Sequence, residues 1–274
     1  TNNAGRGINL GNKGFNMRNV QITRTRGTAG AFFEQNNSTI DPVVIINCTF
    51  DNCECRNNIN RCFLLSTYTE SFTFTNITIQ NMIERGNTGY SGVININNAL
   101  DTFVIDNLKI INNSCNSDYC GGSGLWIVKT NKILFNNCSF INNAVLKSPN
   151  SRTIKPVGQT EYFSGDGGGI QYGFTTSLSN HDIIFNECLF RQNKAVRHGG
   201  TIALQMIQAV EIINCTFESN FANYQPASFT SSDLLFENHF NKKTEGRGGA
   251  IYLNPSFTTN QGDFYTKSIK IEGC

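Results

Sequence analysis

Apolar residues recur along the whole chain in a group of four positions, separated by two, three and two residues. In the copy near the end of the chain these positions hold Val210, Ile212, Cys215 and Phe217. A spacing of two is the period of a β-strand that buries one face, and the spacing of three indicates a corner between two short strands. The pattern therefore predicts a pair of strands whose buried side chains point the same way.

Copies of this group follow one another about every 30 residues, apart from two longer gaps, which is a period typical of solenoids. At the third of the four positions the copies carry Val20, Cys48, Ile77, Leu108, Cys138, Cys188, Cys215 and Cys274. Internal repetition at this period predicts an elongated repeat protein and not a globular enzyme domain.

The corner is occupied by asparagine in most copies, which suits a bend because asparagine tolerates left-handed backbone angles. These asparagines are Asn19, Asn47, Asn76, Asn107, Asn137 and Asn214. A third strand, introduced by small residues, follows in each repeat, as at Gly168-Gly169-Ile170 and Gly199-Gly200-Thr201-Ile202. Three short strands per turn, each stacked on its equivalent, predict a parallel β-helix, whereas the hairpin turns expected of a β-sandwich are missing.

Two recurring motifs resemble those of a known family. Phe140-x-x-Asn143, Phe190-x-x-Asn193 and Phe217-x-x-Asn220 alternate with Gly248-Gly249-Ala250-Ile251 and its variants. They resemble the FxxN and GGAI repeats of chlamydial polymorphic membrane proteins, and similar right-handed β-helix repeats occur on large surface proteins of protists. The resemblance covers nearly the whole chain and implies a right-handed helix and a surface location.

We therefore expect an all-β fold, a right-handed parallel β-helix (solenoid) of about seven coils with three short strands per coil. It should form a single domain over residues 1–274, with insertion loops at about residues 144–164 and 221–245. The chain starts within a third-strand motif and stops just after Ile269 and Ile271, so we expect a segment of a longer protein.

Composition narrows the possible partners. Charged residues make up 15% of the chain and the formal net charge is +2, which gives no strong field for nucleic acid. No apolar run approaches the roughly 20 residues of a membrane-spanning helix. We expect neither nucleic-acid binding nor membrane insertion.

The ten cysteines fall into two groups. Cys48, Cys138, Cys188, Cys215 and Cys274 occupy the buried position, where packed thiols are favoured over disulfides between adjacent coils. Cys53, Cys55, Cys62, Cys115 and Cys120 are expected in loops. There we predict one disulfide between Cys115 and Cys120, and one between Cys62 and either Cys53 or Cys55. A metal site at the latter cluster is disfavoured because no histidine lies near it, and we expect no cofactor.

Seven sequons of the N-x-Ser/Thr type are candidates for N-glycosylation. They begin at Asn36, Asn37, Asn47, Asn76, Asn112, Asn137 and Asn214. Repeats rich in Asn and Thr also generate sequons by chance. Together with the expected disulfides, the seven sites favour a secreted glycoprotein at the cell surface or outside the cell.

A catalytic β-helix, such as a polysaccharide lyase or hydrolase, needs carboxylates paired across neighbouring coils. The outward positions of the repeat bring no two carboxylates together. His198 lacks an acid partner, and Asp166 fits a turn. We therefore predict no catalytic, cofactor-binding or metal-binding residues.

An outward apolar strip stands out on the first strand of the repeat, formed by Val44, Val104, Leu134 and Ile184. Exposed apolar surface usually marks a contact, either with another subunit or with an inserted loop. Trp126 and Tyr252 on the third strand could stack on a sugar or lie under a loop. We predict a structural or adhesive segment of a filamentous assembly, which binds further copies or coils of itself end to end, with other surface proteins or glycans as further candidates. The alternative is a carbohydrate-binding or polysaccharide-degrading β-helix.

Overall fold

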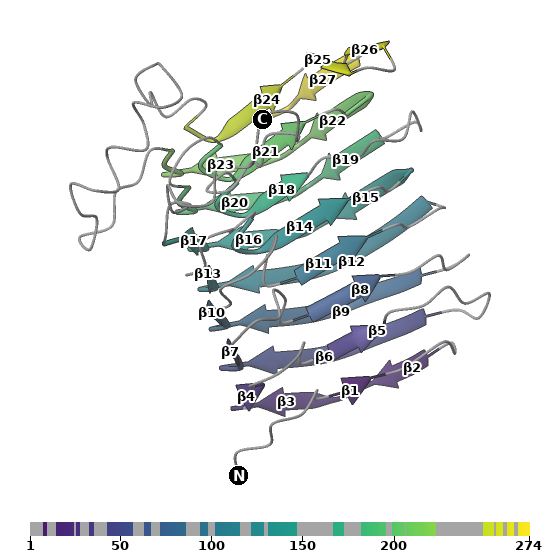
Figure 1. The fold of residues 1–274 in the computed structure, drawn as a ribbon, viewed down its shortest axis with the longest axis vertical. Helices are drawn as coiled ribbons and strands as arrows, with labels where there is room; N and C mark the ends of the chain where they lie inside the picture. Colours follow the sequence, from purple (N-terminus) through teal and green to yellow (C-terminus); the bar gives the residue numbers. More distant parts are fainter. Residues whose placement is uncertain are drawn as a thin grey trace.

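The structure is a computed structural model of residues 1–274. The residues that it describes are 8–9, 15–24, 26–27, 33–35, 43–56, 63–66, 72–85, 94–97, 102–115, 122–128, 131–146, 167–172, 182–195, 199–205, 207–222, 249–254, 256–259, 262–265 and 268–274. In this part of the chain the regular elements are β-strands, and nearly all of them pair in parallel. Figure 1 shows the strands as stacked rungs that follow the sequence from one end to the other.

The largest sheet has twelve strands, with the main order β2-β6-β9-β12-β15-β19-β22-β27. Its members are β2 (Phe15–Arg18), β3 (Gln21–Thr23), β6 (Val43–Asp51), β9 (Phe72–Gln80), β12 (Thr102–Ile111), β15 (Lys132–Asn136), β16 (Ser139–Ile141), β19 (Asp182–Asn186), β20 (Leu189–Arg191), β22 (Ala209–Ile213), β23 (Thr216–Glu218) and β27 (Ser268–Glu272). Each strand pairs with the equivalent strands of the repeats before and after it.

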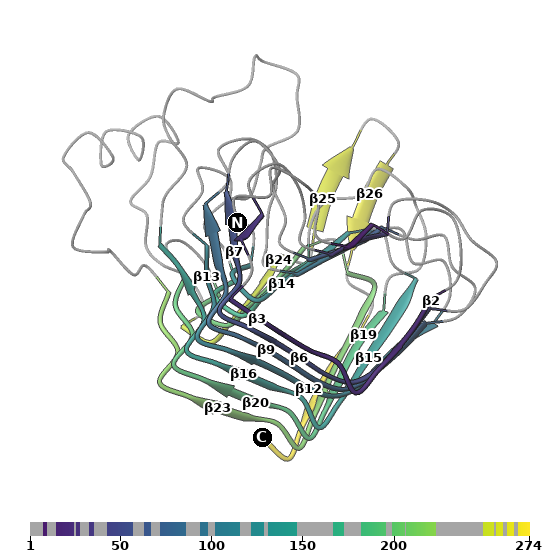
Figure 2. The same ribbon diagram turned by 90° about the horizontal axis from the view of Figure 1, so that it is seen from below.

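A second sheet has eight strands, which are the third strands expected from the small-residue motifs. They are β1 (Ile8–Asn9), β5 (Phe33–Gln35), β8 (Phe63–Ser66), β11 (Ile94–Asn97), β14 (Leu125–Val128), β18 (Ile170–Tyr172), β21 (Ile202–Gln205) and β24 (Ile251–Asn254). A short antiparallel pair, β25 (Ser256–Thr259) and β26 (Gly262–Tyr265), lies beside the stack (Figure 2).

A third sheet of five short strands was not predicted. It consists of β4 (Arg26–Gly27), β7 (Glu54–Arg56), β10 (Ile83–Arg85), β13 (Ser114–Cys115) and β17 (Ala144–Val145). Seen along the stack, the equivalent strands of successive rungs lie over one another and the sheets meet at corners (Figure 2). The expectation of an all-β fold with parallel, stacked repeats is thus confirmed, and the arrangement is compatible with a β-helix.

The number of strands per repeat differs from the expected three. One repeat contains β15, β16, β17 and β18, because a second corner turns the chain into the five-stranded sheet. In β6, β9 and β12 the strand continues through the first corner as a bend. The first corner itself is as expected, since its asparagines have φ between 50° and 56°. A second set of left-handed residues, including Asn52, Asn81, Asn112 and Asn142, forms the unpredicted corner.

Apolar residues stack in register inside the repeats. Ile45, Phe74, Ile105, Phe135, Phe185 and Ile212 form one interior column. All of them are at most 2% exposed. The rings of Phe135 and Phe185 stack with centroids 5.0 Å apart, and those of Phe140 and Phe190 with centroids 5.2 Å apart. These spacings match the distance between paired strands, so the predicted column is confirmed.

Glycine is required where neighbouring coils approach most closely. A Cβ atom added to Gly168 would overlap the carbonyl oxygen of Gly200 and would lie 2.5 Å from the backbone nitrogen of Lys194. Gly167 and Gly199, which precede the strands β18 and β21, also have positive φ. The glycine motifs therefore serve the close approach of backbones.

The first residues of both expected insertions belong to the stack of strands. Ala144 and Val145 form β17 inside the expected loop of residues 144–164, and Phe221 forms a parallel bridge with Lys194 at the start of residues 221–245. These residues still belong to the stack because each pairs with an equivalent residue of a neighbouring repeat. The remaining positions of both loops, beyond Leu146 and Ala222, lie outside the described residues.

Candidate functional surfaces

A column of buried asparagines runs through the core beside the five-stranded sheet. It contains Asn113, Asn143 and Asn193, each at most 1% exposed, and the partly buried Asn220. The Asn143 side chain accepts hydrogen bonds from the Asn113 backbone N–H and Nδ2, both at 3.1 Å, and donates to the Ile110 carbonyl at 2.9 Å. The same contacts recur at Asn193. Asn143, Asn193 and Asn220 are the asparagines of the FxxN motif, and the column satisfies the backbone of the turn inside the core.

Two further asparagine ladders lie on the outside of the corners. In the first, each amide Nδ2 donates to the Oδ1 of the preceding coil, from Asn107 to Asn76 at 2.8 Å, on to Asn47 at 2.9 Å and on to Asn19 at 3.1 Å. In the second ladder, Asn142 donates to Asn112 at 2.9 Å and Asn112 donates to Asn81 at 3.3 Å. These asparagines are exposed, apart from the half-buried Asn107, so water competes with the bonds and the net stabilisation of each is about 0.5–1.5 kcal/mol or less.

The sequons divide according to these ladders. Asn47, Asn76 and Asn112 use both amide atoms in ladder bonds. Asn137 and Asn214 are exposed, and neither side chain makes a hydrogen bond to a described residue. Asn36 and Asn37 lie outside the described residues. Glycosylation itself stays a prediction at every site.

The thiol column has the expected form at four of its five positions. Cys48, Cys138, Cys188 and Cys215 are buried free thiols, whereas Cys274 is an exposed one. A hydrogen bond with the Cys138 side chain, together with burial, raises the pKa of Cys188 to about 12. A hydrogen bond with Cys188 and burial raise the pKa of Cys215 as well. Cys188 and Cys215 are therefore poor nucleophiles at neutral pH, because the reactive thiolate form is disfavoured.

Three of the five cysteines expected in loops are corrected by the structure. Cys55 lies in β7 and not in a loop. Cys53 is a buried thiol that donates to the Asp51 carbonyl at 3.5 Å, so it is not the disulfide partner of Cys62. Cys115 lies in β13 and not in a loop; it is fully buried and disulfide-bonded. Cys62, Cys120 and the Cys55 side chain lie outside what the structure describes, so the pairings Cys115–Cys120 and Cys55–Cys62 stay predictions.

The predicted apolar strip is only partly exposed. Val104, Leu134 and Ile184 lie opposite one another in adjacent strands, and Val44 is separated from Val104 by the exposed Thr73. All four apolar side chains are half-buried. A role as an interface stays a prediction.

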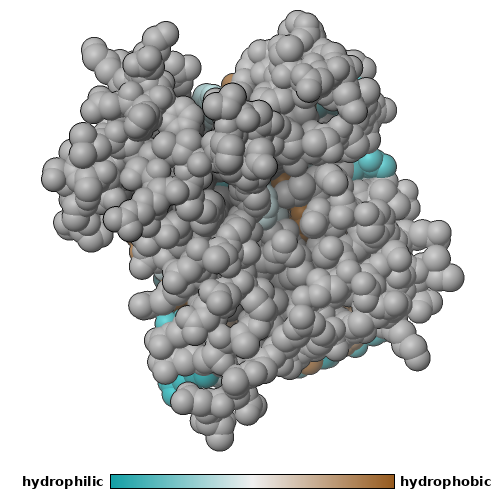
Figure 3. All heavy atoms as spheres, viewed as in Figure 1, coloured by the Kyte–Doolittle hydropathy of each residue, from teal (hydrophilic) through white to brown (hydrophobic). Residues whose placement is uncertain are grey.

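The outer face of the eight-stranded sheet is covered between its two aromatic residues. Trp126, Gln171, Ala203 and Tyr252 lie opposite one another in successive strands. Gln171 is 2% exposed and Ala203 is fully buried, while Trp126 and Tyr252 are half-buried. This burial favours a covered face over an open platform for sugar stacking. In the space-filling view of Figure 3 the described residues form separate small hydrophilic and hydrophobic areas.

The carboxylates of the described strands lie opposite basic or neutral residues. Asp182 lies opposite Lys132, and Glu218 lies opposite Arg191. Glu211 lies opposite Lys270. In the described registers no carboxylate faces another, and among the described residues no group of three or more His, Cys, Asp or Glu could hold a metal ion. Asp166 and the three histidines, His181, His198 and His239, lie outside this part of the chain.

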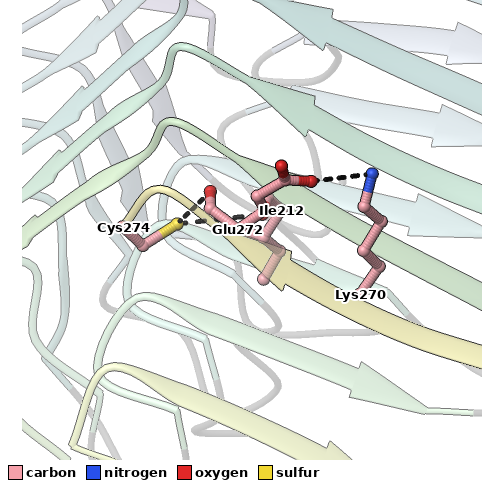
Figure 4. A network of polar contacts seen from close by, with 4 residues as sticks. All are labelled: Ile212, Lys270, Glu272 and Cys274. Atoms are coloured by element: carbon pink, nitrogen blue, oxygen red, sulfur yellow. Dashed lines mark hydrogen bonds and ion pairs between the residues drawn. The ribbon is translucent and has the colours of Figure 1, made fainter.

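Among the described strands, β27 ends the main path of the twelve-stranded sheet. All five residues of β27 are exposed, and Ile269 and Ile271 are 49% and 56% exposed. Lys270 and Glu272 form an ion pair at 2.9 Å, and the Cys274 thiol donates to the Glu272 carbonyl at 3.5 Å (Figure 4). The hydrogen bond between the side chains of Lys270 and Glu272 raises the pKa of Lys270 and lowers that of Glu272. β27 pairs with β22 on one side, so its other edge offers unpaired backbone groups among the described residues.

No helix in the described part of the chain is long and apolar enough to cross a membrane. Comparison with known proteins gave no matching family model, no matching curated protein and no matching solved structure.

Proposed function

We propose that this chain is a right-handed parallel β-helix of one domain that serves as a structural or adhesive segment of an extracellular or cell-surface filamentous assembly. It is non-catalytic, secreted and glycosylated in this proposal. The repeat motifs and their resemblance to surface proteins support the location, and the described geometry supports a rod.

The observation that carries the proposal is the in-register stacking of eight equivalent strands along the main path of the twelve-stranded sheet. Identical positions follow one another at the strand spacing of about 4.8 Å, both in the core and on the surface. Such stacking joins each coil to its neighbours and gives an extended surface along the stack. These are the properties of a spacer or an adhesive rod.

The charge arrangement favours a non-catalytic role over the alternative of a polysaccharide-degrading enzyme. A lyase or hydrolase brings two carboxylates, or carboxylates and calcium, to one site on the coil surface. Here Asp182 and Glu218 each lie opposite a basic residue of the adjacent strand. We expect no cleavage of acidic polysaccharides with or without calcium. Turnover that a single Asp or Glu substitution abolishes would overturn this part of the proposal.

End-to-end contact is the proposed mode of assembly. Ile269 and Ile271 occupy the column positions that are buried in earlier coils, and on β27 they are 49% and 56% exposed. An unpaired parallel strand with exposed apolar residues favours pairing with another strand. The proposed partner is a further coil or a further copy of the chain.

Small-angle scattering and sedimentation velocity test this mode. The wild-type chain should give elongated particles whose length increases with concentration. The variant Ile271→Lys should lower this association, because a charge would have to be buried at the contact, whereas Lys270→Gln on the same strand serves as the matched control. A compact, monodisperse particle of unchanged size in all three proteins would contradict the assembly proposal.

A further inference from the structure

The corner asparagines provide a comparison between chemically similar sites in different surroundings. The corner column consists of the left-handed residues at the first corner of each repeat, which are Asn19, Asn47, Asn76, Asn107, Asn137, Glu187, Asn214 and Gly273. Backbone hydrogen bonds tie neighbouring corners together, as from Asn137 N–H to the Asn186 carbonyl and from Asn214 N–H to the Glu272 carbonyl. The column therefore keeps the strand spacing of about 4.8 Å throughout.

In the early coils the corner amides are fully engaged. The Asn47 Nδ2 donates to Asn19 at 3.1 Å, and its Oδ1 accepts from Asn76 at 2.9 Å. Asn76 is held in the same way between Asn47 and Asn107. Nδ2 is the atom to which an N-linked sugar attaches, so a sugar would have to fit between side chains only one strand spacing apart. Asn112 in the second ladder has the same restriction.

The ladder stops at Asn107, and one coil beyond Asn137 the corner column contains a glutamate. Glu187 lies between Asn137 and Asn214, and it provides no amide to continue the chain of Nδ2–H···Oδ1 bonds. Asn137 and Asn214 are exposed, and their side chains make no hydrogen bond to any described residue. On its other side Asn214 borders Gly273, which has no side chain. The hydroxyl residue of its sequon, Thr216, is exposed as well.

We infer that, among the five described sequons, Asn137 and Asn214 are the acceptors of N-linked sugar in the folded protein, and that Asn47, Asn76 and Asn112 stay unmodified. The reaction forms a bond between Nδ2 and the anomeric carbon of a sugar, and breaks the bond from that carbon to the phosphate of a pyrophosphate-linked donor. The pyrophosphate leaves, and one amide proton passes to a base of the transferase. Whether the chain is glycosylated in nature depends on the proposed secretion, whereas the inferred choice between the five sequons of the folded protein does not.

The chain contains its own matched pair. Asn47-Cys48-Thr49 and Asn214-Cys215-Thr216 are the same tripeptide, both at the first corner, one inside the ladder and one outside it. Any intrinsic preference of an enzyme for the sequon therefore cancels between them. Their difference in rate measures the surroundings alone.

The test uses the full chain, folded and produced without glycosylation, together with a soluble N-glycosyltransferase and UDP-glucose. Site occupancy is followed over time by mass spectrometry of proteolytic peptides. Asn214 should react at least about tenfold faster than Asn47, because the Asn47 amide must first leave two hydrogen bonds. Synthetic peptides of the two sequons should differ by less than about twofold, since they lack the ladder. Equal rates at Asn47 and Asn214 in the folded chain would overturn the inference.

A second variant separates the ladder from other causes. Replacing Asn19 and Asn76 together by glycine keeps the left-handed backbone but removes both partners of Asn47. The rate at Asn47 should then approach that at Asn214, and an unchanged rate would show that the ladder does not protect it. Expression in secretory cells tests the proposed function separately. Absence of glycan at every site there would reject the secreted glycoprotein, and would leave the transferase result standing.

Discussion

Replacement of Asn143 by alanine tests how much the buried asparagine column stabilises the fold. Asn143 is fully buried, and its side chain makes four hydrogen bonds. The bonds from Asn113 N–H and to the Ile110 carbonyl both serve backbone groups inside the core. Leaving a buried polar group without its partner costs about 1–3 kcal/mol, and the lost side chain adds a small cavity. The variant should lose about 3–6 kcal/mol of unfolding free energy.

Urea unfolding measures this loss, followed by circular dichroism and by the fluorescence of Trp126, the single tryptophan of the chain. The matched control is Asn142→Gly at the neighbouring residue. Asn142 is exposed and makes one bond to Asn112 at 2.9 Å, and glycine accepts its φ of 51°. We expect a loss within about 1 kcal/mol for the control. An Asn143→Ala midpoint no lower than that of Asn142→Gly, at equal denaturant dependence, would refute the assigned role of the column.

Three further predictions concern packing and titration. Gly168→Ala places a Cβ against the backbone of the next coil and should lower the free energy of unfolding by more than about 3 kcal/mol, measured by thermal or urea unfolding. In the control Gly249→Ala the nearest contact of the added Cβ would be at 3.8 Å, and the loss should be less than about 1 kcal/mol. Phe135→Ala removes a fully buried ring from the interior stack and should cost about 3–5 kcal/mol, visible as a lower urea midpoint. The pKa of Cys188 is raised to about 12 from 9.0, which means that the folded state holds the thiol proton more tightly than the unfolded state does. The contribution of Cys188 to the free energy of unfolding is therefore complete below pH 9 and is lost as pH rises toward 12. Unfolding free energies measured from pH 8 to 11 should fall in the wild type and should fall less in Cys188→Ala.

The interior apolar columns could be predicted because one physical rule governs them. Ile45, Phe74 and Phe135 recur at a fixed place in each repeat, and each must be buried against its equivalent in the next coil. A spacing of two that is broken by one step of three indicates two strands and a corner, and this pattern can be recognised within a single repeat. The corner asparagines followed from their tolerance of positive φ.

The five-stranded sheet was missed because the buried position just before each of its strands is not uniformly apolar. Cys53, Met82, Asn113 and Asn143 precede β7, β10, β13 and β17, and Asn193 precedes the bridge at Lys194. A search for recurring hydrophobic residues passes over asparagine, which usually lies on the surface. The signal was the constant distance from the Phe of each FxxN motif to its Asn, which is better explained by a stacked position than by a turn on the surface. The same omission placed Cys115 in a loop, although it is fully buried in β13.

The sequons show a different limit of sequence reasoning. A tripeptide at Asn47 and the same tripeptide at Asn214 are indistinguishable as motifs. What separates them is the residue at the same corner of the adjacent coil, about one repeat away in the chain. That residue is Asn76 for the first site, and Glu187 and Gly273 for the second. Only the register between coils supplies this information.

The three asparagine ladders together explain how the coils keep their register. Apolar columns stabilise any arrangement that buries them, whereas an amide bonds correctly only to the matching residue of the next coil, so a slip by one residue would unpair it. The buried column runs from Asn113 to Asn220. Most of its length lies in the later coils, beyond Asn107, where the first outer ladder has ended. In the earlier coils Cys53 and Met82 fill the buried position, and there the outer ladder from Asn19 to Asn107 is continuous. Each part of the stack thus contains at least one uninterrupted set of amide bonds, and the second outer ladder from Asn81 to Asn142 spans the coils where the first outer ladder ends and the buried column begins.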